Sequence, residues 1–521
     1  MTTSSIDPYS LLEPYNPWWS NLAWYKEDPL LQAFEESILN KEPRLYYHLH
    51  QRIHTRGKYG IITLRGPRRA GKTTLIKLLI KHLLVERRIY PKSIFYVSLD
   101  YEGLEDVKLV NLLEAIASSG RYEKYVFLDE ASIYPGWAQA LKNLYDMNLV
   151  LRGKMKIIAT GSHSMDLAEA ASKLRGRQGN FAELFNVGGN LIHLPLRFPE
   201  VVEAIRGEID RYFNKQRLRT PGLRFELLKK LASGEIPEII QYIYYIYDNY
   251  FQLLQTLFDD YLIHGGYPRA IDEYHKKGAI SGEFYSDLAE LLVKDSVKAG
   301  LDPDNLKRLL FALTEPKRLS STVSFSKIDG IGLDEDARPK RRFGLGWYLE
   351  YLRTTWTFFF SNRELGESGS CKPNPEAEVK NYVLDPFIYH SLYSYLRNIP
   401  NPYDKSIELL SDEGFKGQLV ESVIASHLLL SQQLFERVPS VDYSRVLMYR
   451  KKSYNDKEQE TDFILCIKKR GKSYRFIMES KLRRTPTHVI PEEGKIVLTK
   501  DILTTRSNMI YIPVSLFLLI F

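Results

Sequence analysis

Apolar and polar positions in the first third of this chain alternate in blocks that are typical of a parallel α/β protein. A β-branched run at residues 61–64 predicts a buried strand, and the amphipathic run at 75–80 predicts the helix after it. Further apolar runs at 93–100, 124–129 and 154–162 predict additional strands. This alternation predicts a parallel sheet with helices on both faces, and a ligand site at the carboxyl ends of its strands.

The loop between the first strand and its helix has the G-x-x-x-x-G-K-T pattern of a phosphate loop. Gly66 and Gly71 allow the backbone to fold around phosphates, while the helix N-terminus directs N–H groups at the anion. Lys72 is placed to reach the β- and γ-phosphates, and the Thr73 hydroxyl to ligate Mg²⁺. A chance match in a glycine-bearing turn is the alternative, which the order of strand, loop and helix disfavours. The pattern predicts that ATP with Mg²⁺ is held by Gly66, Pro67, Arg68, Arg69, Ala70, Gly71, Lys72, Thr73 and Thr74.

A second strand end supplies the acidic part of a hydrolytic site. The run at 124–130 ends in Asp129, which we expect to hold Mg²⁺ through water, and Glu130, which we expect to polarise the attacking water. A buried strand that ends in a solvated acidic turn is the alternative. The next strand ends near Thr160 and Ser162, which could contact the γ-phosphate or the lytic water, or could cap the next helix. A glutamate directly after the aspartate favours hydrolysis by water over phosphoryl transfer to a substrate.

Length and composition set broad limits. A chain of 521 residues is too long for one core and predicts several domains, and its 44% apolar and 26% charged residues are ordinary for globular protein. The net charge of +8 is compatible with a polyanionic partner. Two cysteines, Cys371 and Cys466, exclude a disulfide framework, and we expect them to be packing residues in a reducing cytosol. No signal peptide or membrane span is visible, so we expect a cytoplasmic protein with no membrane partner.

Several short segments follow one another in a recognisable order: NPWW (16–19), LDEASIYPGWAQALKNLYD (128–146), ATGSHSMDL (159–167), LRGR (174–177), LPLRFPEVV (194–202) and HGGYPRAI (264–271). With the phosphate loop they resemble the archaeal and bacterial AAA-type ATPases, relatives of the STAND class. Each segment is weak alone, and their order carries the likeness. The resemblance implies a parallel-sheet P-loop core of the ASCE/AAA type, a helical lid, a winged helix and a nuclease-like C-terminal domain.

The resemblance also implies roles for residues outside the phosphate loop. Arg175 or Arg177 would neutralise charge on the transferred phosphoryl group, from the same chain or from a neighbouring subunit, with a basic surface turn as the alternative. Gly266 and Pro268 resemble the turn with which related ATPases place a helical lid against adenine, because a proline ring packs on a base and needs no donor. A plain turn between two helices is the alternative there.

The region from Leu291 to Asn362 is predicted to hold short helices and a variable loop. Its sequence predicts helices at 304–316 and 343–352 and the start of a short helix at 321–327. This order suits a helix-turn-helix, and the family resemblance implies the winged type. The basic cluster at 338–342 could meet DNA phosphates, although such loops are commonly only solvated and such domains often act as hinges.

A second set of acidic residues lies near the C-terminus. Glu421 lies on an amphipathic helix at 417–428, Asp462 opens a strand at 460–467, and Glu479 and Lys481 end a strand at 475–481. Alternation along the last strand puts Glu479 and Lys481 on one face. The spacing resembles the PD-(D/E)XK nuclease superfamily, in which such carboxylates bind Mg²⁺ and the lysine orients or activates water. A structural ion pair between Glu479 and Lys481 is the alternative.

We therefore expect an α/β protein with an N-terminal helical extension (1–55), a P-loop ATPase core (56–205), a helical lid (206–290), a winged helix (291–370) and a restriction-endonuclease-like α/β domain (371–521). The expected function is Mg²⁺-dependent ATP binding and hydrolysis that drives or gates the C-terminal module, with DNA as the target. A nucleotide-switched DNA-binding or scaffold protein with an inactive nuclease-like domain is the alternative. Self-association and a protein partner are both left open.

Overall fold

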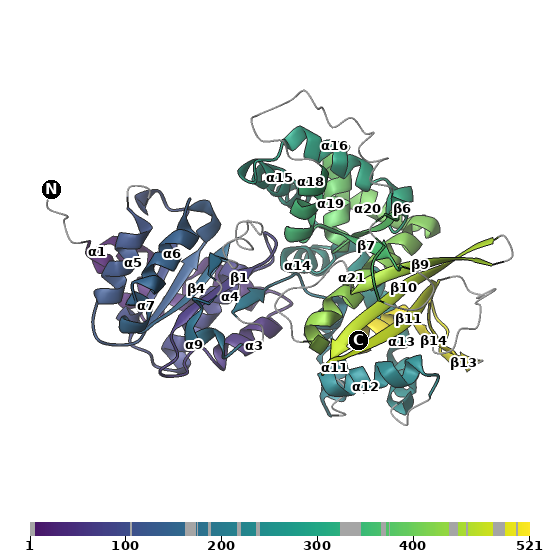
Figure 1. Cartoon of the computed structure of the whole chain (residues 1–521), viewed down its shortest axis with the longest axis horizontal. Coiled ribbons are helices and arrows are strands. Elements are labelled where there is room, and N and C mark those ends of the chain that lie inside the picture. The colour runs from purple at the N-terminus through teal and green to yellow at the C-terminus, as the bar shows by residue number, and fades with distance from the viewer. Residues whose placement is uncertain are drawn as a thin grey trace. The chain divides into compact units, whose positions relative to one another are not determined.

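The computed structural model falls into two compact units, Met1–Leu194 and Pro195–Phe521, here called the N-terminal and C-terminal units (Figure 1). In Figure 1 the N-terminal unit is purple to blue and the C-terminal unit is teal to yellow. The structure describes residues 6–104, 107–161, 173–174, 176–185, 189–215, 220–235, 240–323, 345–365, 371–374, 376–436, 446–454, 457–482, 495–506 and 509–521.

A sheet of parallel strands forms the centre of the N-terminal unit, in the order β2-β3-β4-β1-β5. The strands are β1 (Gly60–Arg65), β2 (Ile94–Ser98), β3 (Lys124–Asp129), β4 (Met155–Gly161) and β5 (Asn190–Ile192). The four strands predicted from apolar runs are confirmed as β1 to β4. Because all strands run in one direction, the phosphate loop after β1 and the carboxyl ends of β3 and β4 lie at the same edge of the sheet.

Helices cover both faces of this sheet, as predicted. On β3, Tyr125 and Phe127 belong to one hydrophobic core, whereas Val126 and Leu128 belong to a second core. This alternation follows from the two-residue period of a strand. The first core is completed by α2 (Pro29–Glu36), α3 (Arg44–His50) and α4 (Lys72–Lys81), and the second by α5 (Leu109–Ser118), α6 (Trp137–Asp146) and α7 (Leu149–Arg152).

The N-terminal extension packs on the edge strand β2. The Asn16 side chain accepts from the Tyr96 amide at 2.7 Å and donates to the Tyr96 carbonyl at 2.9 Å. The indole N–H groups of Trp18 and Trp19 both donate to the Ile94 carbonyl, at 3.2 and 3.0 Å. The NPWW segment therefore satisfies backbone groups that an uncovered edge strand would leave open.

Short elements connect these layers in the N-terminal unit. They include a π-helical turn, η4 (His82–Glu86), that continues directly from α4. The others are α1 (Pro8–Leu12), η1 (Glu13–Tyr15), η2 (Pro17–Trp19), η3 (Trp24–Lys26), η5 (Pro91–Ser93), η6 (Glu102–Leu104), η7 (Ala131–Ile133) and α9 (Gly179–Ala182).

A mixed sheet in the order β13-β14-β12-β11-β10-β9-β7-β8-β6 forms the centre of the C-terminal unit. Its strands are β6 (Thr322–Val323), β7 (Phe358–Arg363), β8 (Val379–Val383), β9 (Leu447–Tyr454), β10 (Lys457–Lys469), β11 (Lys472–Lys481), β12 (Lys495–Thr499), β13 (Thr504–Arg506) and β14 (Met509–Pro513). The strands predicted at 460–467 and 475–481 are confirmed as β10 and β11. Both β6 and β7 precede the expected domain boundary at residue 370, yet they belong to the same sheet as the strands after it.

The helices of this unit are α10 (Phe198–Ile205), α11 (Gly207–Lys215), α12 (Pro221–Ala232), α13 (Ile240–His264), α14 (Pro268–Lys277), α15 (Gly282–Lys298), α16 (Pro303–Leu313), η8 (Pro316–Arg318), α18 (Leu345–Thr354), α19 (Pro386–Leu396), α20 (Pro402–Ser411), α21 (Glu413–Glu436) and α22 (Val514–Ile520). The helix predicted at 417–428 is confirmed within α21. Of the helices in the described ranges, none combines the length and the apolar character that crossing a membrane requires.

The segment predicted to be a winged helix differs in one element. Helices are confirmed at α16 and α18, but the short helix expected to start at 321 is wrong where it can be compared, because Thr322–Val323 form β6 and pair with β8. β-Branched Thr and Val suit a strand once a partner strand is present, which a local pattern cannot reveal. The basic cluster at 338–342 lies outside the described residues.

Cys371 and Cys466 are joined by a disulfide bond, so the expectation of two packing cysteines is wrong. Cys466 lies on β10, and the Cys371 amide donates to Glu364 Oε1 at 3.2 Å. The two cysteines are 95 residues apart and belong to no spacing motif. They meet only in the tertiary structure, where the segment between β7 and β8 lies beside β10.

Candidate functional site

The phosphate loop joins the end of β1 to the start of α4 in a tight turn. Gly66 has no room for a side chain, because a Cβ there would lie 1.8 Å from the His193 carbonyl oxygen. Gly71 has a left-handed backbone, with φ of 94°, and is the N-cap of α4. Glycine reaches such a conformation without steric cost. Both glycines of the motif are therefore required by the backbone path, which leaves the helix N-terminus open to an anion.

The side chain of Lys72 folds back over this loop. It is only 6% exposed, and its Nζ donates to the carbonyl oxygens of Gly66 at 2.9 Å and Pro67 at 2.8 Å. A phosphate oxygen is a stronger acceptor than a neutral carbonyl. Lys72 is thus held at the loop in a position from which a phosphate could recruit it.

Asp129 is fixed at the carboxyl end of β3 by its neighbours in the sheet. The Tyr96 hydroxyl on β2 donates to Asp129 Oδ2 at 2.9 Å, and the Thr160 hydroxyl on β4 donates to Oδ1. Asp129 is 2% exposed and Thr160 is fully buried. Two hydroxyl donors from flanking strands hold the carboxylate in one orientation, which suits a group that positions a hydrated cation.

Of the remaining ATPase candidates, Glu130 and Arg177 are described by the structure, and Ser162 and Arg175 are not. Glu130 follows Asp129 directly and has a left-handed backbone with φ of 48°, which is uncommon for a residue with a side chain. Arg177 forms an ion pair with Asp146 at the end of α6, with Nε and Oδ1 2.7 Å apart.

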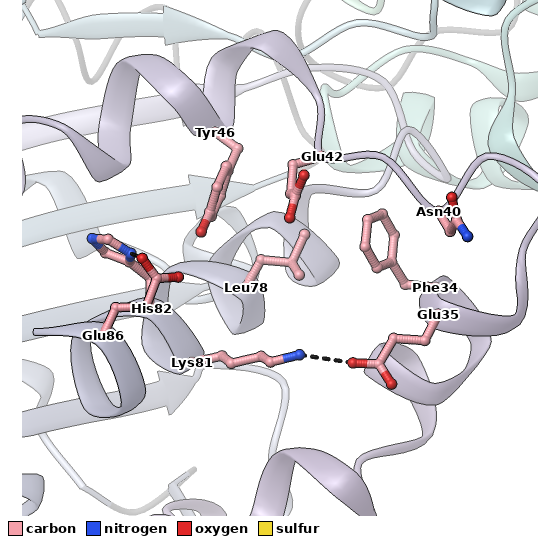
Figure 2. A pocket seen from close by; sticks show the side chains of 9 residues that line it. All are labelled: Phe34, Glu35, Asn40, Glu42, Tyr46, Leu78, Lys81, His82 and Glu86. Atoms are coloured by element: carbon pink, nitrogen blue, oxygen red, sulfur yellow. Dashed lines mark hydrogen bonds and ion pairs between the residues drawn. The ribbon is translucent and has the colours of Figure 1, made fainter. Parts of the chain in front are cut away.

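The far end of α4 borders a separate cavity, shown in Figure 2. It lies between α4, η4 and the helices of the N-terminal extension. Its lining contains none of the phosphate-loop residues.

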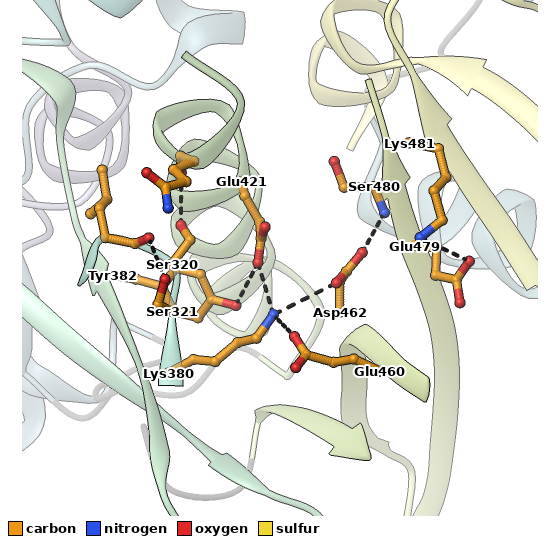
Figure 3. A network of polar contacts seen from close by, with 12 residues as sticks. Ser320, Ser321, Lys380, Tyr382, Glu421, Glu460, Asp462, Glu479, Ser480 and Lys481 are labelled. Carbon is orange, nitrogen blue, oxygen red and sulfur yellow. Dashed lines mark hydrogen bonds and ion pairs between the residues drawn. The ribbon is translucent and has the colours of Figure 1, made fainter. Parts of the chain in front are cut away.

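The predicted acidic residues of the C-terminal unit meet around a lysine that the sequence did not point to. Lys380 on β8 lies 2.9 Å from Glu421 Oε1 and 3.6 Å from Asp462 Oδ1, and it also forms an ion pair with Glu460 (Figure 3). Burial opposes its charge, but Tyr382 and the surrounding carboxylates hold the pKa of Lys380 well above its ordinary value. Lys380 is 2% exposed and therefore forms a buried cation at the centre of three carboxylates.

Glu479 is part of a different pairing. It is 4% exposed and forms an ion pair with Lys495 on the neighbouring strand β12, while Lys481 Nζ lies 3.7 Å from Glu479 Oε2. This agrees with the prediction that Glu479 and Lys481 share a face of β11. Asp462 Oδ2 accepts from the Ser480 amide at 2.9 Å. The four predicted residues are thus divided between two lysine-centred clusters.

These contacts do not fit the magnesium site that the nuclease resemblance implies. Such a site needs carboxylate oxygens that converge on one cation. The ammonium of Lys380 already neutralises Glu421 and Asp462, and Glu479 is neutralised by Lys495. Within the ranges that the structure describes, no three His, Cys, Asp or Glu residues gather as a metal ion would require. Burial raises the pKa of Glu421 to about 7, because a negative charge on this side chain is unfavourable at a buried position.

The HGGYP turn has a clear packing role within the C-terminal unit. A Cβ on Gly266 would lie 1.8 Å from the Leu196 carbonyl oxygen, and one on Gly265 would lie 2.0 Å from Asp385 Oδ1. The Gly266 amide donates to Asp385 Oδ2 at 2.7 Å. Pro268 is the first residue of α14, where its missing N–H is not needed. These contacts explain why the turn contains Gly265, Gly266 and Pro268, and the explanation does not require a bound nucleotide.

Five residues with clear roles in these sites were not predicted: Tyr96, Lys380, Asp385, Glu460 and Lys495. Asp385 follows a strand and precedes a proline, an arrangement typical of a helix N-cap, so its local signal was available. The others act across strands that are distant in the sequence. No local pattern marks a tyrosine or a lysine as the partner of a remote carboxylate.

Comparisons with known proteins agree with the N-terminal geometry. Residues 58–202 match a family model described as an AAA domain, and residues 255–400 match a domain of unknown function, DUF8612. The uncharacterized protein MJ1637 of Methanocaldococcus jannaschii is 35% identical over 123 residues, which are 23% of this chain and 24% of that protein. The chain thus matches about a quarter of the length of this curated relative. Residues 58–202 are thus similar to an AAA domain, in agreement with the phosphate-loop pattern and the parallel sheet of the N-terminal unit.

The chain also has low similarity to two solved structures. The Walker-type ATPase paby2304 of Pyrococcus abyssi is 15% identical, with 67% of this chain and 94% of that chain covered and a TM-score of 0.33. The ORC2 protein of Aeropyrum pernix, in its ADP form, is 12% identical, with 72% and 98% covered and a TM-score of 0.26.

Proposed function

We propose that the N-terminal unit binds ATP with Mg²⁺ at the edge of its sheet and hydrolyses it. This proposal is supported by the position of the phosphate loop and Asp129 at the same edge of the parallel sheet, where Tyr96 and Thr160 orient the Asp129 carboxylate. Bound Mg²⁺ would neutralise charge on the β- and γ-phosphates. We assign Thr73 and Asp129 to the magnesium ion and Lys72 to the phosphates.

Glu130 is the proposed base for the attacking water. It directly follows the metal-holding Asp129, so both carboxylates start from the same strand end. We keep Ser162 as a candidate contact to the γ-phosphate and Arg175 as a candidate transition-state arginine. Arg177 is less suited to that role, because its guanidinium is engaged by Asp146.

ATP turnover by the purified full chain tests this assignment. Lys72→Ala should abolish hydrolysis, and Glu130→Gln should retain ATP binding while turnover falls by about 100-fold or more. The matched control is Lys77→Ala, which removes a lysine from the same helix that pairs with Asp28. Hydrolysis that survives unchanged in Lys72→Ala would contradict the proposal.

For the C-terminal unit we favour the alternative of a nuclease-like arrangement without cleavage. This is supported by Lys380, whose ammonium group occupies the position among Glu421, Glu460 and Asp462 where a metal ion would be expected. We propose that the nucleotide state of the N-terminal unit gates this unit as a DNA-binding or scaffold module. Plasmid DNA incubated with Mg²⁺ or Mn²⁺, with and without ATP, should remain intact. Nicking that is lost in both Asp462→Ala and Glu479→Ala would instead establish a nuclease.

A DNA partner rests on the net charge of +8 and on the basic cluster at 338–342. Binding that depends on phosphate contacts must weaken steeply with salt. Affinity for duplex DNA measured between 50 and 200 mM salt should therefore fall by roughly 10³-fold if several lysines and arginines contact phosphates. No binding at the lower salt concentration would exclude DNA as the target.

A further inference from the structure

A cavity of about 310 Å³ lies at the C-terminal end of α4, away from the phosphate loop at the N-terminus of the same helix. Its size is at the lower end of the range for small-molecule sites, about 300–1,000 Å³. The extension contributes Phe34, Glu35, Asn40, Glu42 and Tyr46, and the end of the helix contributes Leu78, Lys81, His82 and Glu86 (Figure 2).

Negative charge exceeds positive charge in this cavity. Three of its lining residues are glutamates, and the Lys81 ammonium is already paired with Glu35 at 2.7 Å. The His82 ring is buried, and this burial lowers its pKa even though Glu86 Oε2 lies 2.9 Å from Nδ1. His82 is therefore uncharged at neutral pH. The carboxylates of Glu42 and Glu86 remain without a lysine or arginine in the pocket to balance them.

A tyrosine hydroxyl also points into the cavity. Tyr46 is 7% exposed as a whole, and its hydroxyl makes no hydrogen bond among the described residues, but the oxygen itself is open to the cavity. Figure 2 shows this hydroxyl directed into the space bordered by Glu42, Leu78 and Glu86. Burial, and then the charges of Glu86 and Glu42, raise the pKa of Tyr46, so the group stays protonated. Because the hydroxyl oxygen is open to the cavity, a ligand bound there can hydrogen-bond to it directly.

We propose that this pocket binds an aliphatic diamine or polyamine. Glu42 and Glu86 would each receive an ammonium group, while Phe34 and Leu78 would contact the methylene chain. The Tyr46 hydroxyl would accept a hydrogen bond from an ammonium, and the aromatic faces attract cations. A metal ion fits less well, because the described residues include no group of three ligands around one point. The continuous helix formed by α4 and η4 ends at Glu86, and this C-terminal end adds a favourable negative dipole.

This inference goes beyond the proposed ATPase activity and can be tested separately. Isothermal titration of the full chain with spermidine and with putrescine, at neutral pH, should show one site. Glu42→Gln and Glu86→Gln should each weaken binding at least about tenfold, because each loses one charge pair. Tyr46→Phe removes only the hydroxyl and should weaken spermidine binding less. Lys72→Ala should bind spermidine as the wild type does, so failure of the ATPase proposal would leave this result intact.

The matched control is Glu13→Gln, which removes the same charge from an exposed position of the N-terminal unit that does not line the cavity. It should bind spermidine like the wild type. Circular dichroism must show that the pocket variants are folded. Absence of spermidine binding would overturn the proposal. An equal loss in Glu13→Gln, or equal heat from MgCl₂ at the same concentration, would also overturn it, since binding would then reflect overall charge.

Discussion

Replacement of Lys380 by methionine tests whether the C-terminal acidic cluster is an internal ion-pair network. Lys380 is 2% exposed and contacts Glu421, Glu460 and Asp462, so Lys380→Met leaves three carboxylates without their cation. Loss of one partner of a buried pair costs about 3–5 kcal/mol of unfolding free energy. Because the Glu460 side chain is 33% exposed, water screens part of its charge, and we expect about 3 kcal/mol.

Urea unfolding followed by circular dichroism measures this loss. The matched control is Lys294→Met, which removes a lysine that is 70% exposed and lies 2.9 Å from Glu290 on α15, and its unfolding midpoint should barely change. Mg²⁺ should not raise the midpoint of the wild type, but it should raise that of Lys380→Met, where the carboxylates can accept a divalent ion. A loss below about 1 kcal/mol in Lys380→Met would refute the reasoning. Stabilisation of the wild type by Mg²⁺ that disappears in Asp462→Asn would refute it as well.

Three further predictions concern other parts of the chain. Thr160→Val removes a donor to Asp129 and should lower the turnover of ATP about tenfold while ATP affinity is retained, as steady-state kinetics and a binding titration would measure. Burial raises the pKa of Asp385 to about 7, so the folded state binds more protons than the unfolded state, and the unfolding free energy should fall as pH rises from about 4 to 7. Urea unfolding at several pH values should show a smaller dependence in Asp385→Asn, with the remainder due to Glu421, whose pKa is also raised to about 7. Reduction of the disulfide between Cys371 and Cys466 should lower the unfolding free energy by roughly 2–4 kcal/mol, a difference between dithiothreitol and buffer that Cys466→Ser should remove.

The N-terminal unit could be predicted in detail because its signals are local. Each strand is a short apolar run, and the phosphate-loop pattern depends on a backbone path that two glycines define. The parallel order then brings Asp129 beside Thr160 without further information. The orientation of Asp129 by Tyr96 was not predicted, because a hydroxyl on the edge strand carries no pattern of its own.

The C-terminal unit could be predicted only element by element. The helix with Glu421 and the strands with Asp462 and Glu479 form where expected, yet the charges that surround them come from β8 and β12. Lys380 lies 41 residues before Glu421, and nothing in the spacing indicates that they meet. The same limit applies to the disulfide. Motif spacing can place like charges together, but it does not reveal which opposite charge lies between them.

The partners of a buried lysine help to separate a ligand-binding role from a structural one. Lys72 donates to the carbonyls of Gly66 and Pro67, which are neutral acceptors that a phosphate oxygen can replace with a gain in hydrogen-bond strength. Lys380 contacts full negative charges, and moving it away would leave those carboxylates buried and unbalanced. An incoming Mg²⁺ would have to displace this cation as well as lose part of its own hydration. We therefore expect the same type of side chain to favour a phosphate ligand at Lys72 and to disfavour a metal ion at Lys380.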